Sequence, residues 1–322
     1  MKKIIAIIAG DPNSINSEII GKAWKNKSKF KNLNILILGN YILIKKQFKK
    51  LGFKFGVKQI KNFDKQDFNK KLLIYNIPLK FKNIFKIPAS DKASHILSCF
   101  DVAIRLVKMK KISGFINCPI NKIDTFGKNF FGITEFLSKK EGVYGKEVML
   151  IYNKILSVSP LTTHIKLKNV PRHITKNKII NKIKIINNFF IQNFKIKPKI
   201  GVLGLNPHND ELRKDSEEIK KIIPAIKKLK RDRISIRGPL SPDTAFLNFK
   251  DYDVLVGMYH DQVLAPYKSL FKFNAINITL GIPYLRISPD HGVGKNIINK
   301  RLANPQSLIE SVKFFNNKNV KT

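Results

Sequence analysis

Short apolar runs that each end in a turn recur along the whole chain, and stretches with helical spacing of apolar residues lie between most of them. The apolar runs are residues 4–9, 34–38, 72–77, 114–118, 148–152, 155–158, 200–205, 253–258 and 275–280. The stretches with helical spacing are residues 16–24, 41–51, 90–110, 175–194, 215–229 and 305–315. Buried strands that alternate with helices predict an α/β fold rather than an all-α or all-β one.

Local signals place several of the helix ends. Gly52 follows a helical stretch and is a candidate C-terminal cap. Ser90 can cap the long helix that follows it, and Asp215 with Glu218 resembles a capping box. Pro224 lies inside the helix expected there, so we expect a kink at that point.

The chain of 322 residues is long enough for one large α/β unit or for two lobes around a shared cleft. No internal repeat, low-complexity block or long linker divides it. We therefore treat residues 1–322 as a single two-lobed unit whose lobe boundaries the sequence does not mark.

The net charge is the extreme feature of the composition, at +39 from 61 basic and 22 acidic residues. Such a charge is typical of proteins that bind nucleic acid or an anionic surface. The lysines are, however, spread through nearly every segment, together with many Asn, Ile and Phe, and no known nucleic-acid-binding module is present. We interpret the charge mainly as a compositional bias and expect no nucleic-acid partner, although a phosphorylated substrate would be attracted.

Cysteine use and the N-terminus predict a cytoplasmic protein. Cys99 and Cys118 form neither a metal-type CxxC motif nor a disulfide framework. The apolar run at residues 3–9 is shorter than that of a secretory signal, and we interpret it as the first strand. No apolar stretch approaches the length of a membrane span, so we expect no membrane partner.

Three of the six histidines directly follow apolar runs. His164, His208 and His260 would therefore lie at the carboxyl ends of strands, where open α/β sheets bind ligands. Three imidazoles that converge there suit a catalytic divalent metal, and they favour zinc, cobalt or iron over magnesium. The alternative is that each histidine only hydrogen-bonds its own loop. The remaining three, His95, His173 and His291, are a helix residue, an exposed residue and a residue of a polar turn.

A set of cationic and amide side chains follows His260 and consists of Lys268, Asn277 and Arg286. Together these side chains can hold a phosphate or a carboxylate. Lys268 is weak evidence in a chain so rich in lysine, whereas Arg286 comes just after a buried strand, where a charge needs a partner. The chain contains neither GxGxxG nor GxxxxGK[ST], so neither a Rossmann fingerprint nor a P-loop is present.

Seven short motifs, spread in order over nearly the whole chain, resemble those of the 4-hydroxythreonine-4-phosphate dehydrogenase family. They are Ala-Gly-Asp-Pro at 9–12, Thr-Thr-His at 162–164, Gly-Leu-Asn-Pro-His at 204–208, Gly-Pro-Leu-Ser-Pro-Asp-Thr at 238–244, Met-Tyr-His-Asp-Gln at 258–262, Asn-Ile-Thr-Leu-Gly-Ile-Pro at 277–283 and Asp-His-Gly at 290–292. The Asn-Pro-His, Tyr-His-Asp-Gln and Asn-Ile-Thr-Leu-Gly blocks are the most specific.

The resemblance implies two α/β/α lobes with a central cleft, as in isocitrate and isopropylmalate dehydrogenases, without the Rossmann glycine fingerprint. It implies NAD- or NADP-dependent oxidation of 4-phosphooxy-L-threonine to a 3-oxo acid, which decarboxylates to 3-amino-2-oxopropyl phosphate in pyridoxal phosphate biosynthesis. A divalent metal (zinc, cobalt or magnesium) would be required, and the active site would be shared across a homodimer.

The resemblance also implies roles for single residues. Its metal ligands are His164, His208 and His260. The residues implied to contact substrate are Thr134, Lys268, Asn277 and Arg286. Asp243 is the candidate base or partner of a ligand, and the cofactor-binding residues are not identified.

Three stretches depart from the family pattern. Ile133 stands where the family usually has a substrate-contacting histidine, and residues 13–17 and 209–212 contain fewer glycines than usual. Two other functions therefore stay open. One is a sister dehydrogenase that acts on another phosphorylated hydroxy acid, such as a four-carbon sugar-acid phosphate. The other, suggested by the charge alone, is a non-enzymatic protein that binds phosphate or nucleic acid.

Overall fold

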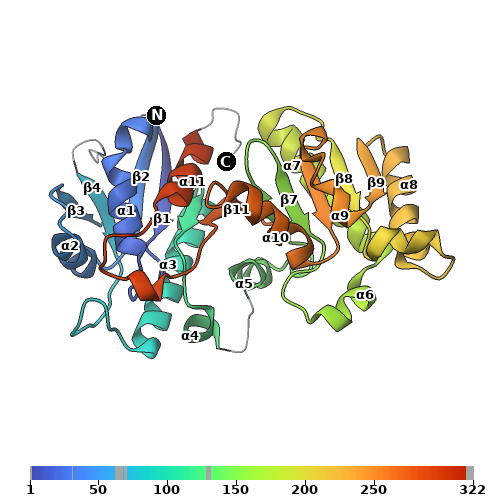
Figure 1. The fold of residues 1–322 in the computed structure, drawn as a ribbon. Coiled ribbons are helices and arrows are strands. Elements are labelled where there is room, and N and C mark those ends of the chain that lie inside the picture. The colour runs from blue at the N-terminus through green and yellow to red at the C-terminus, as the bar shows by residue number, and fades with distance from the viewer. Residues whose placement is uncertain (1, 31, 62–67, 69–70, 128–131, 317–322) are drawn as a thin grey trace. The chain divides into compact units, whose positions relative to one another are not determined.

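The computed structural model describes residues 2–30, 32–61, 68, 71–127 and 132–316 (Figure 1). The chain forms two compact units. Unit 1 contains the described residues of Met1–Ile133 and Tyr284–Lys318, and unit 2 contains Thr134–Pro283. No helix in the described residues is both long and apolar enough to cross a membrane.

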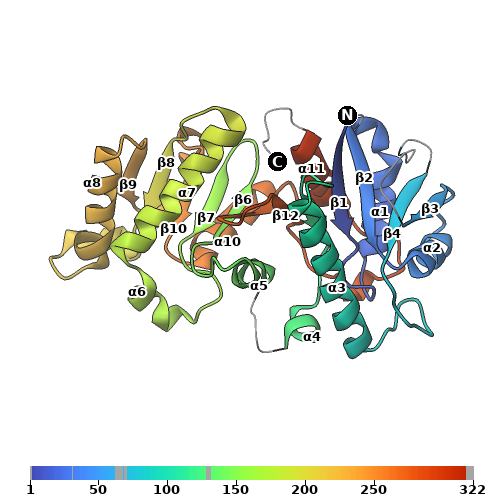
Figure 2. The same cartoon turned by 180° about the vertical axis from the view of Figure 1, so that it is seen from behind.

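Unit 1 is built on a sheet of six strands in the order β3-β4-β2-β1-β5-β12, in which all neighbours are parallel. The strands are β1 (Lys3–Ile8), β2 (Leu33–Gly39), β3 (Val57–Ile60), β4 (Leu72–Asn76), β5 (Phe115–Asn117) and β12 (Arg286–Pro289). The helices are α1 (Asn16–Lys25), α2 (Tyr41–Lys50), α3 (Ala89–Lys108), α4 (Lys122–Phe126) and α11 (Gln306–Asn316). Helices α1 and α11 lie on one face of this sheet and α3 on the other (Figures 1 and 2).

Unit 2 has a mixed sheet in the order β11-β6-β7-β10-β8-β9. Strand β6 is antiparallel to β11 and β7, whereas β7, β10, β8 and β9 pair in parallel. The strands are β6 (Val148–Tyr152), β7 (Ser157–Pro160), β8 (Ile200–Leu203), β9 (Ile236–Leu240), β10 (Val254–Gly257) and β11 (Ile276–Leu280). The helices are α5 (Ile133–Lys140), α6 (Val170–His173), α7 (Lys176–Phe194), α8 (Ile223–Arg231), α9 (Pro242–Ala245) and α10 (His260–Phe271).

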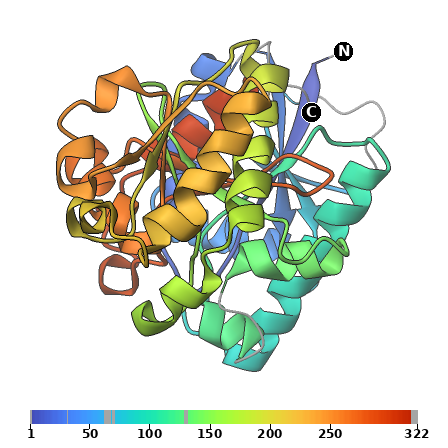
Figure 3. The same ribbon diagram turned by 90° about the vertical axis from the view of Figure 1, so that its right-hand side faces the viewer.

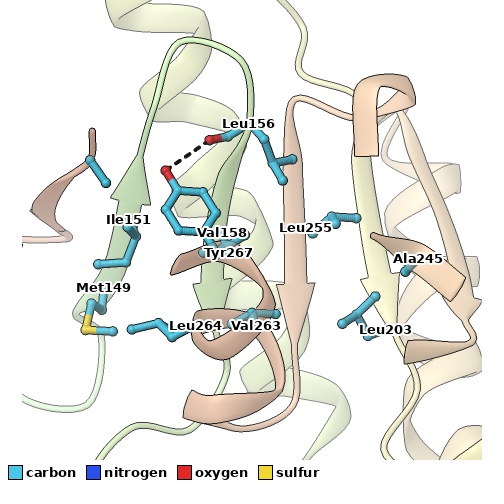
Figure 4. Close-up of a cluster of buried hydrophobic side chains, with 11 residues drawn as sticks. Met149, Ile151, Leu156, Val158, Leu203, Ala245, Leu255, Val263, Leu264 and Tyr267 are labelled. Atoms are coloured by element: carbon cyan, nitrogen blue, oxygen red, sulfur yellow. Dashed lines mark hydrogen bonds between the residues drawn. The ribbon is translucent and has the colours of Figure 1, made fainter. Parts of the chain in front are cut away.

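Helices cover both faces of the unit 2 sheet. Helix α10 lies on one face, while α7 and α8 run side by side on the other (Figures 1 and 3). Beneath α10 a cluster of buried side chains joins β6, β7 and β10, and the Tyr267 hydroxyl donates to the Leu156 carbonyl oxygen at 3.3 Å (Figure 4). This packing fixes the carboxyl ends of the strands relative to α10.

The predicted α/β class and most predicted elements are confirmed, including the turn at Gly52, which has a φ of +77°. Two helix-start predictions are wrong. Helix α3 begins at Ala89 after Pro88, with no side-chain cap, so Ser90 lies inside the helix. Glu218 makes no capping box, because its carboxylate accepts hydrogen bonds from the backbone of Leu205 instead.

Pro224 lies in the first turn of α8, directly after the π-helical turn Glu218–Ile222. The backbone is helical without a break from Glu218 to Arg231, so Pro224 lies inside one continuous helical segment, and its missing N–H removes a hydrogen bond to the preceding turn. The irregularity expected at Pro224 is therefore a change of helix type that precedes the proline.

Candidate active site

The carboxyl ends of three neighbouring parallel strands carry the three predicted metal-binding histidines. Strand β10 lies between β7 and β8 and pairs with both in parallel. His164 follows β7, His208 follows β8, and His260 is the first residue of α10, which begins shortly after β10. The sequence prediction that these histidines lie at strand ends along one edge of a sheet is confirmed.

The imidazole rings of His164 and His260 are neighbours, with 6.0 Å between their centroids. Each ring has a carboxylate at Nδ1. Glu135 Oε1 lies 3.0 Å from His164 Nδ1, and Asp261 Oδ1 lies 2.6 Å from His260 Nδ1. A carboxylate that accepts a hydrogen bond from Nδ1–H holds the imidazole in the tautomer whose Nε2 lone pair can bind a metal.

Glu135 is a site residue that the sequence reasoning missed. It lies on α5, and besides His164 its Oε1 accepts a hydrogen bond from the Thr163 hydroxyl at 3.2 Å. Burial alone would raise the pKa of Glu135, but the hydrogen bond and charge of His164 outweigh burial and lower the pKa to about 2. Glu135 directly follows the predicted contact Thr134, and a carboxylate at that position is the sequence signal that could have led to it.

The loop that carries His208 has an unusual backbone. Five consecutive residues without glycine, His208 to Leu212, all have positive φ, and His208 itself has φ 48° and ψ 25°. Such left-handed conformations are costly for residues with a Cβ and persist only where surrounding contacts enforce them. The missing glycines of this loop, noted in the sequence, therefore do not prevent the left-handed turn.

Buried hydrogen bonds hold the start of this loop. Glu218, which is fully buried, accepts from the amides of Leu205 at 2.7 Å and Asn206 at 2.9 Å. The side chain of Gln262 accepts from the Met258 amide and donates to the Gly204 carbonyl oxygen. Gln262 thus connects the carboxyl ends of β10 and β8, where His260 and His208 are attached.

The imidazole nitrogens at this edge suit a divalent metal, but the described residues do not form a complete metal site. Among the described residues, no three His, Cys, Asp or Glu side chains form a group that could hold a metal ion. His164 and His260 do fit the task of ligands, because both are partly exposed and both have Nδ1 engaged by a carboxylate. The three-histidine ligand set stays a prediction.

Two predicted substrate contacts lie together in unit 2. The Thr134 hydroxyl on α5 is 3.2 Å from the Thr279 hydroxyl on β11, and both residues are buried. On the same strand, Asn277 Oδ1 is buried without a hydrogen-bond partner among the described residues. A buried acceptor without a donor is unfavourable, so Asn277 is suited to receive a hydrogen bond from a ligand.

The other predicted contacts are more dispersed. Lys268 is exposed on α10. Asp243 is exposed on α9, where the hydrogen bond from Ser241 lowers its pKa and the charge of His208 adds to the effect. Arg286 belongs to unit 1, where it is 2% exposed and its Nε donates to Asn117 Oδ1 at 2.6 Å.

The remaining three histidines have the locations predicted from the sequence. His95 is buried in α3, 3.1 Å from the Pro78 carbonyl oxygen, and His173 is exposed. His291 lies in a turn with its Nδ1 3.0 Å from the Gly292 carbonyl oxygen. Cys99 and Cys118 are free and buried, and burial raises the pKa of both thiols.

Comparison with known proteins identifies close relatives over the full length. Residues 31–315 match the family model described as pyridoxal phosphate biosynthetic protein PdxA. The 4-hydroxythreonine-4-phosphate dehydrogenase of Sulfurihydrogenibium sp. (strain YO3AOP1) is 42% identical over 96% of each chain. That of Aquifex aeolicus (strain VF5) is 37% identical over 98% of each chain.

Solved structures agree with these matches. The structure of a putative 4-hydroxythreonine-4-phosphate dehydrogenase from Salmonella typhimurium superimposes with a TM-score of 0.87 at 28% identity, and 98% of this chain and 99% of that chain are covered. The enzyme of that name from Klebsiella pneumoniae gives a TM-score of 0.83 at 26% identity, with 97% and 98% covered.

Proposed function

Because the chain belongs to the family of the pyridoxal phosphate biosynthetic protein PdxA, we propose that it oxidises 4-phosphooxy-L-threonine. The product is a 3-oxo acid that decarboxylates to 3-amino-2-oxopropyl phosphate. The observation that carries this proposal is the pair of adjacent imidazoles, His164 and His260, each held by a carboxylate at the end of a strand.

The cofactors are NAD or NADP and a divalent metal, zinc, cobalt or magnesium, with His164, His208 and His260 as the metal ligands. When bound, the metal would act as a Lewis acid that favours the alkoxide form of the substrate hydroxyl, and the nicotinamide would accept the hydride. Imidazole ligands favour zinc and cobalt over magnesium.

The protein's own contribution is to orient the ligands and the substrate. Glu135 and Asp261 fix the imidazoles of His164 and His260. Fixed ligands need no reorganisation during the reaction, and this preorganisation is a main source of catalysis. Asp243 on α9 is the candidate base; the hydrogen bond from Ser241 lowers its pKa, which keeps the carboxylate ionised but makes it a weaker proton acceptor.

Substrate binding uses the polar groups of Thr134, Lys268, Asn277 and Arg286. Lys268 and Arg286 supply positive charge for the phosphate, Lys as a point charge and Arg as a planar fork. The unpartnered Oδ1 of Asn277 accepts a hydrogen bond from the ammonium or hydroxyl of the substrate.

Decarboxylation follows from the chemistry of the product. The 3-oxo acid has its ketone β to the carboxylate, which makes loss of CO₂ easy.

We further propose that the chain works in the cytoplasm as a homodimer with a shared active site. This assembly is the one that the family resemblance implies. The buried free cysteines fit a reducing compartment.

One observation keeps a second substrate in view. Ile133, two residues before Glu135, is only 9% exposed and offers no hydrogen bond where the family resemblance implies a histidine. The loss of a polar side chain there keeps open a sister dehydrogenase whose substrate is another phosphorylated hydroxy acid. The phosphorylated four-carbon sugar acids are the class to compare.

The test is kcat/KM for reduction of NAD and NADP with 4-phosphooxy-L-threonine and with a four-carbon sugar-acid phosphate. We expect the wild type to prefer 4-phosphooxy-L-threonine. We expect Ile133→His to improve that value severalfold, because one added hydrogen bond contributes about 0.5–1.5 kcal/mol. A wild type that barely acts on 4-phosphooxy-L-threonine, and that Ile133→His does not rescue, would refute this substrate assignment.

A further inference from the structure

Unit 1 contains a cavity of about 580 Å³ that involves none of the proposed active-site residues. It lies between helix α2 and the segment that leads into β3, and all its lining residues come from Tyr41 to Val57. Its volume falls in the range of roughly 300–1,000 Å³ that is usual for small-molecule sites. The lining therefore indicates which chemical class would bind there.

The floor of the cavity is aromatic. Phe48, Phe53 and Phe55 form a triangle of rings whose centroids are 5.5, 5.2 and 5.4 Å apart. Phe48 is 3% exposed and anchors the triangle, whereas Phe53 and Phe55 are half-buried and expose part of their rings to the cavity. Half-exposed aromatic faces favour a flat apolar body, which can stack on them or meet them edge to face.

The rim of the cavity is cationic. It carries Lys45, Lys46 and Lys49 on α2 and Lys54 on the following segment, all of them exposed. The stretch Tyr41–Val57 contains no Asp or Glu, and no described acidic side chain forms a salt bridge with these four lysines. Among the residues that the structure describes, the rim thus presents several positive charges without a counter-charge, which suits a multiply charged anion.

Lysines also lie over ring faces at this site. Lys45 Nζ is 5.8 Å from the Tyr41 ring centroid, and Lys25 Nζ from α1 is 5.2 Å from that of Phe53. Such cation–π contacts hold ammonium groups beside the aromatic floor. Apolar rings and ammonium groups are therefore close enough for one small molecule to contact both.

We propose that this cavity binds an aromatic phosphate ester, with its ring on the phenylalanine floor and its phosphate among the lysines of the rim. A phosphate dianion has more negative charge than a single carboxylate, so it can pair with several lysines at once, each of which acts as a point charge. The substrate of the proposed reaction has no ring, so this site is separate from the proposed function and does not depend on it.

The test uses 1-naphthyl phosphate as the probe, with binding followed by its fluorescence. In the wild type we expect 1-naphthol and inorganic phosphate each to bind at least tenfold more weakly than the ester, because each lacks one half of the ligand. Decyl phosphate tests whether an alkyl chain serves as well as a ring, and we expect it to bind more weakly too. Affinity for the ester should fall as salt is added, since exposed charges are screened.

Two sets of variants locate the site. The double variant Lys45→Gln with Lys49→Gln should weaken binding tenfold or more. Its matched control, Lys227→Gln with Lys230→Gln on exposed positions of α8, removes the same charge and should leave binding unchanged. Phe53→Leu keeps an apolar side chain but removes a ring, so it should weaken naphthyl phosphate and leave decyl phosphate unaffected.

Three outcomes would overturn the proposal. Equal losses in the two double-lysine variants would mean that net charge alone attracts the ester. Tighter binding of decyl phosphate would replace the aromatic class by an alkyl one. Binding that survives both cavity variants but disappears in Arg286→Ala would place the ester at the substrate site.

Discussion

The hydrogen bond between Glu135 and His164 joins two residues that lie 29 positions apart in the sequence. Only the fold brings them together, because α5 and the loop after β7 meet at the end of a strand. Glu135 is held in turn by the Thr163 hydroxyl, the residue next to His164. Mutation of a residue that hydrogen-bonds a metal ligand usually changes the metal affinity, although that residue does not contact the metal.

We predict that Glu135→Gln lowers the affinity for a divalent metal about 10- to 100-fold, the range usual for such partners. The glutamine keeps the size of the side chain but removes its charge. Titration of the metal-free protein with cobalt measures the affinity independently of turnover. The matched control is Glu310→Gln, at a carboxylate of α11 whose described contacts are with Gln306 and Lys313. Equal cobalt affinity in wild type and Glu135→Gln would remove Glu135 from the site.

Site residues were predictable where the signal was local. His164, His208 and His260 follow apolar runs directly, so the sequence places them at strand ends. Glu135 and Glu218 were not predictable in their roles, because their partners are distant and depend on packing. Glu218 is part of a local capping pattern, but its carboxylate hydrogen-bonds the amides at the start of the His208 loop instead of capping the helix.

At the scale of elements, helix α7 has a regular helical spacing of apolar residues and also a lysine within its buried stripe. Its buried stripe contains Ile179, Ile183 and Ile186, as the helical spacing predicts, but Lys182 belongs to the same stripe and is only 8% exposed. Burial, together with the charge of Lys178, lowers the pKa of Lys182 to about 8, although Glu147 and Glu135 oppose the shift. The helix thus carries a charge in its apolar face.

We predict that Lys182→Met stabilises the protein at pH 7 and does so less at pH 10. Between the folded pKa of about 8 and the usual 10.5, the unfolded chain binds the proton and the folded one does not, so wild-type stability rises with pH there. Below pH 8 the cost of the buried charge is complete, at roughly 3 kcal/mol.

Thermal melting at both pH values measures this difference. Lys176→Met, at an exposed position of the same helix, is the control and should change the melting temperature little at either pH. A shift for Lys182→Met that is equal at pH 7 and pH 10 would contradict the assigned titration.

The elements that sequence reasoning missed are short or contain residues that argue against them. Strand β9 includes Pro239, and β12 begins with Arg286 and ends with Pro289. Helix α10 contains Pro266. Local propensity penalises such residues, and tertiary contacts overrule the penalty. The long periodic helices, such as α7, were predicted to within a few residues.

At the scale of the whole molecule, acidic residues are scarce, with 22 against 61 basic ones. In unit 1, two of them share one buried lysine. Lys92 Nζ lies 3.1 Å from Asp11 Oδ2 and 2.6 Å from Asp124 Oδ2, and Lys92 and Asp11 are 4% and 1% exposed. These ion pairs connect α3 with the loop after β1 and with α4.

We predict that Lys92→Met destabilises unit 1 by about 3–5 kcal/mol, because it leaves the buried Asp11 carboxylate without its counter-charge. Trp24, the single tryptophan, lies buried in α1 of unit 1 and reports on that unit. Its fluorescence should show unfolding at clearly lower denaturant concentration in Lys92→Met than in wild type. An unchanged Trp24 transition would mean that the ion pairs contribute nothing to unit 1.

The central claim is a metal-dependent dehydrogenase that uses the histidines at the strand ends. Its most direct test is to measure CO₂ and reduced nicotinamide formed from 4-phosphooxy-L-threonine by wild type, by His260→Ala and by His173→Ala, at an exposed histidine of α6. We predict that wild type and His173→Ala form the two products in equal amounts, and that His260→Ala forms neither. Chelation should abolish product formation by wild type and His173→Ala, and zinc, cobalt or magnesium should restore it. Full turnover by His260→Ala, or by wild type stripped of metal, would contradict the account.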